Sequence, residues 1–100
     1  MKKRFIVVVS RANPAQDEAF RQFIKSQGFA WWHWLPTLWL LTDAGGGWDA
    51  ANICDKTVEC YTGAQVFVEE LDASGNNTWA GWGPKSESRN MFHWLQTNWK

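Results

Sequence analysis

A run of five apolar residues, Phe5 to Val9, constrains the fold of this chain more than any other segment. Its β-branched side chains favour a strand, and the absence of alternation is typical of a central strand covered on both faces. Asn13-Pro14-Ala15-Gln16 follows. Asn at the N-cap, Pro at the first helical position and Gln at the third predict a helix start with a capping box. We therefore expect a strand over 4–10 and then a helix that Gly28 ends in left-handed geometry.

Strand and helix signals alternate along the rest of the chain. Strands are expected over 29–34, 38–42 and 65–69, and a second helix over 48–61. The predicted inward stripes are Ala19, Phe20, Phe23 and Ile24 on the first helix, and Trp48, Ala51, Cys54 and Val58 on the second. Turn residues fill 72–84, and Ser86 or Ser88 can cap a C-terminal helix. The order predicts one α+β domain over 1–100: a ferredoxin-like βαββαβ antiparallel sheet with helices on one face plus a C-terminal helix.

Charge and composition exclude several classes of protein. Ten basic and ten acidic residues cancel, so no global field attracts nucleic acid or lipid. Cys54 and Cys60 fall on different faces of the predicted helix, which places them poorly for a disulfide. The isolated His33 and His93 supply no metal-ligand spacing. The apolar runs are too short for a membrane span or a secretory leader. We expect a cytoplasmic protein with no metal, cofactor or membrane partner.

Tryptophan is the unusual component. Nine Trp and six Phe in one hundred residues exceed what two helices and half a sheet would bury. On the strand Trp31-Trp32-His33-Trp34, alternation places Trp32 and Trp34 on one face and Trp31 and His33 on the other. One pair is expected in the core, and the other under the C-terminal helix or in a dimer seam. Alternatively, the outer pair forms an open platform on which bases stack, with Arg4, Arg11 and Lys85 on the phosphates.

Two segments carry a family resemblance. Gly28-Phe29-Ala30-Trp31-Trp32-His33-Trp34-Leu35-Pro36-Thr37-Leu38-Trp39-Leu40 resembles the second-strand signature of short bacterial and phage proteins labelled the SinR family, which is distinct from the sporulation regulator of that name. Ala80-Gly81-Trp82-Gly83-Pro84-Lys85, followed by a helix with Trp94-Leu95, is similar to that family's C-terminal pattern. The resemblance covers most of the chain. It implies a relation to the ferredoxin-like, homodimeric small subunit of CRISPR adaptation (Cas two), a group with metal-dependent nucleases and purely architectural dimers.

The residues argue against catalysis. The resemblance implies a nuclease aspartate at the end of the first strand, where this sequence has Ser10 beside Arg11. A divalent cation needs anionic oxygen ligands, which Ser10 does not supply. Ser10 with His33 or His93 lacks a third orienting group, and Gly45-Gly46-Gly47 lacks the Gly-Lys-Ser/Thr ending of a phosphate-binding loop. Glu69-Glu70 is expected to be solvated. We therefore expect no catalytic or metal-binding residues.

The expected function is binding. We expect a homodimeric, non-enzymatic protein whose Trp-rich surface engages a protein partner, in the setting of a phage or mobile-element accessory or anti-defence factor. A nucleotide or nucleic-acid binding module with aromatic stacking is the alternative, and a metal-dependent nuclease of the adaptation type is the third hypothesis. The candidate binding residues are Arg4, Arg11, Trp32, Trp34, Trp82 and Lys85.

Overall fold

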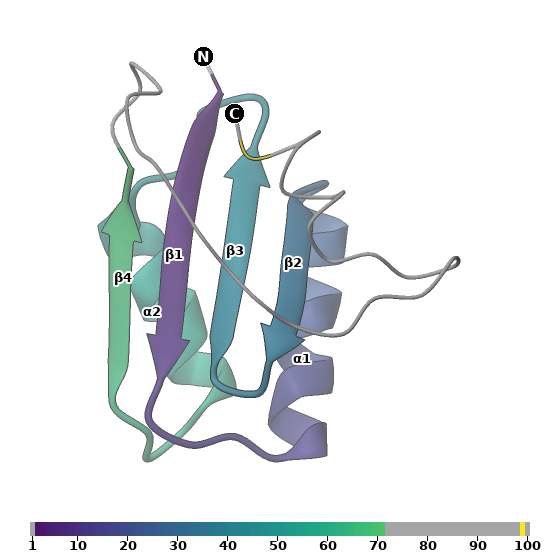
Figure 1. Ribbon diagram of the computed structural model, residues 1–100, viewed down its shortest axis with the longest axis vertical. Coiled ribbons are helices and arrows are strands. Elements are labelled where there is room, and N and C mark those ends of the chain that lie inside the picture. The colour runs from purple at the N-terminus through teal and green to yellow at the C-terminus, as the bar shows by residue number, and fades with distance from the viewer. Residues whose placement is uncertain (1, 72–98, 100) are drawn as a thin grey trace.

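Residues 2–71 and 99 are described by the computed structural model, which places two helices behind a four-stranded sheet (Figure 1). The strands are β1 (Lys3–Val9), β2 (Ala30–Leu35), β3 (Leu38–Asp43) and β4 (Val66–Glu70), and the helices are α1 (Pro14–Ser26) and α2 (Ala50–Cys60). The strand order is β2-β3-β1-β4, and all neighbouring pairs are antiparallel. This is the predicted ferredoxin-like α+β arrangement. The predicted turn segment 72–84 and the C-terminal helix lie outside the described residues.

The β1 strand occupies the centre of the sheet, as its continuous apolar run predicts. It pairs with β3 on one side and with β4 on the other. Phe5, Val7 and Val9 are buried against the helical layer. Ile6 and Val8 alternate with them and are half-buried on the opposite face. Both faces of β1 are therefore apolar, although two helices can cover only one of them.

The start of α1 confirms the predicted capping box. The Asn13 side chain accepts a hydrogen bond from the Gln16 N–H, and the Gln16 side chain accepts one from the Asn13 N–H. Gly28 ends the turn after the helix with a φ of 74°, as expected. Phe20 and Ile24 are buried and Phe23 is half-buried, but Ala19 is exposed. The prediction for Ala19 is wrong because the buried stripe is centred on Phe20 and Ile24.

The inward face of α2 differs from the prediction. Ile53 and Thr57 are buried, whereas Ala51 and Val58 are exposed. The Thr57 hydroxyl donates to the Ile53 carbonyl at 2.7 Å, which satisfies the polar group inside the core. An apolar pattern alone therefore selects the wrong face. Cys54 and Cys60 are both free and half-buried.

A buried carboxylate shapes the loop that leads into α2. Asp43 is the last residue of β3 and is buried. Its two oxygens accept hydrogen bonds from the N–H groups of Gly45 and Trp48. Trp48 lies before the helix, and its ring packs edge-on against Phe23 and Phe29. Asp49, the next residue, caps α2 by accepting from the Asn52 N–H.

Within the described ranges, neither helix has the length and apolar character needed to cross a bilayer.

Replacement of Asn13 by alanine tests the α1 cap. Asn13→Ala removes the acceptor for the Gln16 N–H, and we expect it to lower the free energy of unfolding by about 1 kcal/mol. Asn13→Asp keeps an acceptor at the same place and should stay close to the wild type. Urea unfolding followed by circular dichroism measures both, and equal losses in the two variants would contradict the capping role.

Candidate interaction surface

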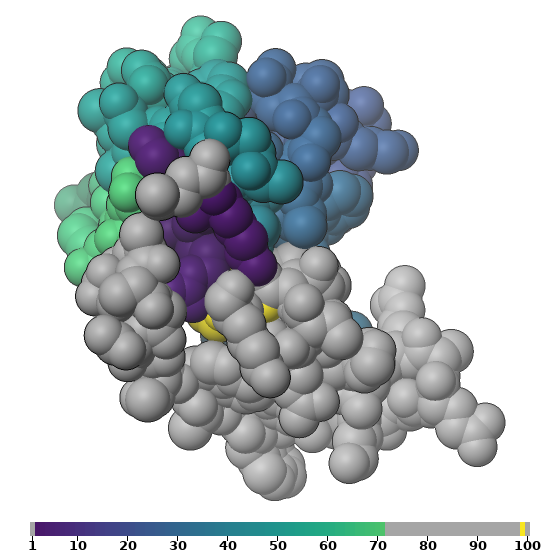
Figure 2. Space-filling model, turned by 90° about the horizontal axis from the view of Figure 1, so that it is seen from above, coloured from purple at the N-terminus to yellow at the C-terminus, as the bar shows by residue number. Residues whose placement is uncertain are grey.

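The sheet face opposite the helices, called the open face below, is covered at its centre by a tryptophan from far along the chain. Trp32, Leu40 and Trp99 form a buried cluster there, against which Ile6, Leu38 and Leu71 pack. The register sets Leu40 opposite both Ile6 and Trp32, so these side chains form one row across three strands. Trp32 is only 7% exposed. In the end-on view of Figure 2, the teal and blue segments lie to one side of β1 (purple).

Arg4 is part of this cover. Its side chain is on the same face of β1 as Ile6, and the residue is 6% exposed. The guanidinium Nη1 donates to the Trp99 carbonyl at 2.7 Å, and its Cζ lies 5.6 Å from the centre of the Trp99 ring. Such a cation–π contact is strongest where water is excluded. Arg4 therefore holds Trp99 against the open face.

A bulge in β2 changes which residues reach the open face. Trp32 pairs with Leu40 and Leu35 pairs with Leu38, so two residues of β2 stand opposite one residue of β3. Directly paired residues share a face, and Leu35 therefore joins Leu38 and Trp32 on the open face. We predicted from strict alternation that Trp34 would take this place. The extra residue breaks the alternation, and the register gives the place to Leu35.

One row of apolar residues crosses all four strands. It lies at the end of the sheet where β1 and β2 terminate, as the strand directions in Figure 1 show. Val8 pairs with Phe67 on one side and with Leu38 on the other, and Leu38 pairs with Leu35. We call Phe67, Val8, Leu38 and Leu35 the apolar row. Phe67 is 59% exposed and Leu35 is 51% exposed, while Val8 and Leu38 are half-buried. Exposed apolar strips are candidates for interaction sites.

The predicted binding residues do not form one group. Arg4 and Trp32 come together under Trp99, and Trp34 is 38% exposed on the bulged strand. Arg11 lies beyond the opposite end of β1 from Arg4, where its guanidinium donates to the Gly63 carbonyl at 3.0 Å. Trp82 and Lys85 lie outside the described residues. The apolar row was missed because only the strand register aligns Phe67 and Leu35 in one row, and no local pattern contains that register.

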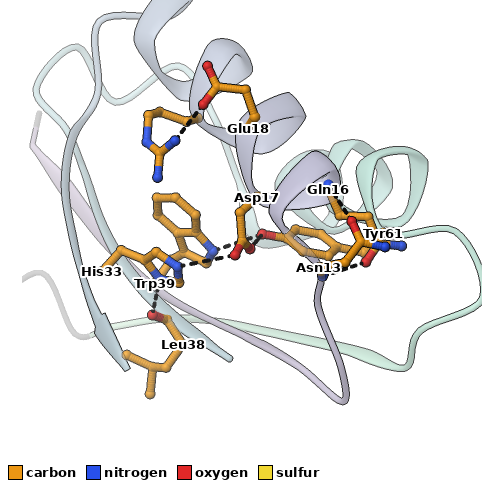
Figure 3. A network of polar contacts seen from close by, with 9 residues as sticks. Asn13, Gln16, Asp17, Glu18, His33, Leu38, Trp39 and Tyr61 are labelled. Atoms are coloured by element: carbon orange, nitrogen blue, oxygen red, sulfur yellow. Dashed lines mark hydrogen bonds and ion pairs between the residues drawn. The ribbon is translucent and has the colours of Figure 1, made fainter. Parts of the chain in front are cut away.

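A polar network crosses the helical side of the sheet (Figure 3). The Tyr61 hydroxyl donates to Asp17 Oδ1 at 2.6 Å and accepts from the Trp39 indole N–H at 3.0 Å. His33 stacks on Trp39, with ring centres 3.7 Å apart and planes 1° from parallel. Its Nδ1 donates to the Leu38 carbonyl at 2.9 Å, and its Nε2 lies 3.8 Å from Asp17 Oδ2. The network connects α1, β2, β3 and the residue that follows α2.

The polar groups of this network are directed at one another. Burial raises the pKa of Tyr61 far above its ordinary value, and the hydrogen bond to Asp17 adds to the shift. Tyr61 is therefore a neutral hydroxyl at physiological pH. Both ring nitrogens of His33 face protein oxygens, which leaves neither directed at an incoming substrate. Burial also raises the pKa of the Cys60 thiol, with Glu59 contributing, so the reactive thiolate is disfavoured.

The remaining sequence candidates have structural roles. The Ser10 hydroxyl accepts from the Gln65 N–H at 2.8 Å, and the Ser10 N–H donates to the Gln65 carbonyl, which extends the β1–β4 pairing. Glu69 and Glu70 are both exposed, and Glu70 lies 3.9 Å from the Lys3 ammonium. In the part of the chain that the structure describes, no three His, Cys, Asp or Glu residues form a group that could hold a metal ion.

Comparison with protein-family models, with curated proteins and with solved structures finds no match for this chain.

Replacement of Tyr61 by phenylalanine tests the network. Tyr61→Phe leaves the buried Trp39 N–H and Asp17 Oδ1 without their partner, and we expect the free energy of unfolding at pH 7 to fall by about 1–3 kcal/mol. Chemical denaturation measures this loss. Val58→Ala, an exposed position on α2, is the control and should change stability little. An unchanged free energy of unfolding in Tyr61→Phe would mean that the network does not stabilise the fold.

The raised pKa of Tyr61 predicts a pH dependence of stability. In the unfolded chain the phenol ionises near its ordinary pKa of 10.0, whereas in the folded chain it keeps its proton to a higher pH. The contribution of Tyr61 to the free energy of unfolding is therefore complete below pH 10. Above pH 10 the free energy of unfolding falls, by up to about 1.4 kcal/mol per pH unit. Tyr61 is the only tyrosine, so Tyr61→Phe should lack this component. Denaturation of both proteins between pH 9 and 11 provides the comparison, and parallel curves would contradict the shift.

Proposed function

We propose that this chain is a non-enzymatic binding protein that engages a protein partner through the apolar row of its open face. The observation that carries the proposal is the exposure of Phe67 and Leu35 at the two ends of a row whose middle is Val8 and Leu38. Among the residues that the structure describes, Phe67 is the one aromatic residue that is more than half exposed. Large aromatic side chains of this kind are the usual anchors of protein interfaces.

The geometry supports a protein partner more than the nucleotide alternative. A stacking platform needs an open ring and nearby cations for the phosphates. Trp32 is buried together with Leu40 and Trp99. The guanidinium of Arg4 donates a hydrogen bond to the Trp99 carbonyl and lies near the Trp99 ring. Glu69, two residues from Phe67 on the same face, adds negative charge that repels phosphate. A titration with oligonucleotides followed by Trp fluorescence tests the alternative. Quenching of the fluorescence at micromolar oligonucleotide would support nucleic-acid binding over the present proposal.

The resemblance to the SinR family supplies the setting for this proposal. It suggests a phage or mobile-element accessory or anti-defence factor that works in the cytoplasm, and it suggests a homodimer. Self-association through the apolar row and binding of a different protein are distinguishable, because only the first makes the sedimentation coefficient of the pure protein depend on concentration and on Phe67.

Site-specific photo-crosslinking tests the proposed surface directly. A photoreactive residue placed at position 67 should crosslink a discrete protein when the full chain is expressed in bacterial cells, and one placed at position 35 should crosslink the same protein. Position 58 is the matched control, because Val58 is similarly exposed, at 50%, but lies on α2. Equal crosslinking from position 58, or none from position 67, would contradict the proposal.

Replacement of Phe67 by serine gives the corresponding loss of function. Phe67→Ser removes the aromatic ring of the apolar row, and this ring is not part of the buried core. We therefore expect partner capture to fall at least about tenfold. The thermal midpoint should change little. Val58→Ser removes a comparably exposed apolar side chain from α2 and should leave capture intact. Capture on immobilised protein, quantified by mass spectrometry, measures both variants.

A further inference from the structure

The two outer strands of the sheet differ in regularity. The β4 strand pairs with β1 in an unbroken register from Val66 to Glu70. The β2 strand, at the other edge, contains the bulge between Trp32 and Leu35. Bulges at an edge interfere with the addition of another strand, whereas a regular edge presents its backbone groups in the right order for pairing. The outer strands of the sheet are β2 and β4 (Figure 1). Of the two, β4 has the regular backbone that pairing with a further strand requires.

The hydrogen-bond pattern identifies the backbone groups that β4 presents outward. The Leu71 N–H donates to the Arg4 carbonyl, and the Ser10 N–H donates to the Gln65 carbonyl. Hydrogen-bonded pairs alternate along an antiparallel ladder, so Phe67 and Glu69 also bond to β1. The N–H and C=O groups of Val66, Val68 and Glu70 then point away from β1. Among the described residues no strand pairs with these six groups, which we call the outer edge of β4.

The side chains at this edge specify what an added strand must carry. Phe67 and Glu69 share the open face because they are two residues apart on one strand. An antiparallel strand bonded to Val66, Val68 and Glu70 would meet Phe67 and Glu69 in non-hydrogen-bonded pairs, where opposing side chains lie closest. Glu70 is near Lys3, whereas Glu69 forms no ion pair with any residue in the described part of the chain. A basic side chain opposite Glu69 would complement it.

We propose that the outer edge of β4 binds an extended segment of another protein as an added antiparallel strand, with an apolar side chain opposite Phe67 and a lysine or arginine opposite Glu69. The inference rests on the proposed function and specifies how its partner is held. Backbone hydrogen bonds to Val66, Val68 and Glu70 supply affinity that does not depend on sequence. The apolar residue and the basic residue, two positions apart in the segment, supply the selectivity.

Charge argues against a second copy of this chain as the added strand. A two-fold pairing of β4 with itself about Val68 would place Phe67 opposite the Glu69 carboxylate of the copy, and it would do so twice. It would also bring two Glu69 and two Glu70 side chains to one edge. Charges on an edge strand are a common device against self-pairing. A basic segment from a different protein avoids both the pairing of Phe67 with a carboxylate and the accumulation of glutamates at one edge.

Two capped peptides test the proposal on the full chain. One contains the core Lys-Val-Phe-Val, which in antiparallel order sets Lys opposite Glu69 and Phe opposite Phe67, and the other contains Glu-Val-Phe-Val. Titration of the isotope-labelled protein by NMR should show tighter binding of the Lys peptide, by about fivefold or more. Binding should slow amide exchange at Val66, Val68 and Glu70, and leave Phe67 and Glu69, already bonded to β1, unchanged.

Charge exchange provides the decisive control. Glu69→Lys should reverse the preference between the two peptides, whereas Asp55→Lys, the same charge change at an exposed site on α2, should preserve it. Glu70→Pro removes one outward N–H without removing a hydrogen bond to β1 and should weaken both peptides. Absence of binding, an unreversed preference, or protection outside β4 would overturn the proposal. Protection of the same three amides without peptide, rising with protein concentration, would replace it with self-pairing.

The test separates this inference from the proposed function. A partner crosslinked from positions 67 and 35 whose capture survives Glu70→Pro and Glu69→Lys would dock on the apolar row without adding a strand. In that case the strand addition is refuted and the binding function stands. The opposite outcome is also possible: no partner crosslinks from position 67, but the peptides still add to β4 of the wild type. That result would refute the apolar row as the partner site and would leave the proposed strand addition supported.

Discussion

The central strand β1 sets the condition that the rest of the structure must meet. It is apolar on both faces and paired on both sides, so the sheet built around it has two surfaces to remove from water. Two helices cover one of these surfaces, where Phe5, Val7 and Val9 lie. The other surface is covered over Ile6, Leu40 and Trp32 by Trp99, and is left half-open over the apolar row. The two faces of the sheet are therefore covered unequally.

The helical side is organised by aromatic rings and one internal polar network. Trp39 receives the ring of Phe20 edge-on and the ring of His33 face-on, while its N–H reaches Tyr61. The aromatic residues thus satisfy their own polar atoms within the core, and among the described side chains no buried nitrogen or oxygen lacks a partner. The polar atoms of these described residues therefore stabilise the core instead of destabilising it.

The parts of the fold that the sequence predicts are those encoded by neighbouring residues. The Asn13–Gln16 capping box and the left-handed Gly28 depend on local geometry, and the structure has both. The inward face of α2 was not predictable from apolar spacing, because Thr57 enters the core through a hydrogen bond to its own helix. The place of Leu35 on the open face depends on a bulge, and bulges arise from the match between two strands. The Asp17–Tyr61 contact joins residues 44 positions apart, which no local pattern encodes.

The contact between Arg4 and Trp99 spans 95 positions of the chain. Closure of so long a loop carries a large entropic penalty, and contacts of this separation form late in folding. The helical layer contains all of its buried residues without Trp99, so it can assemble before that contact exists. The burial of Trp32 and Leu40 on the open face, in contrast, includes Trp99. The two faces of one sheet thus differ in the distance along the chain over which their covers are encoded: within residues 5–61 on the helical side, and across 95 positions on the other.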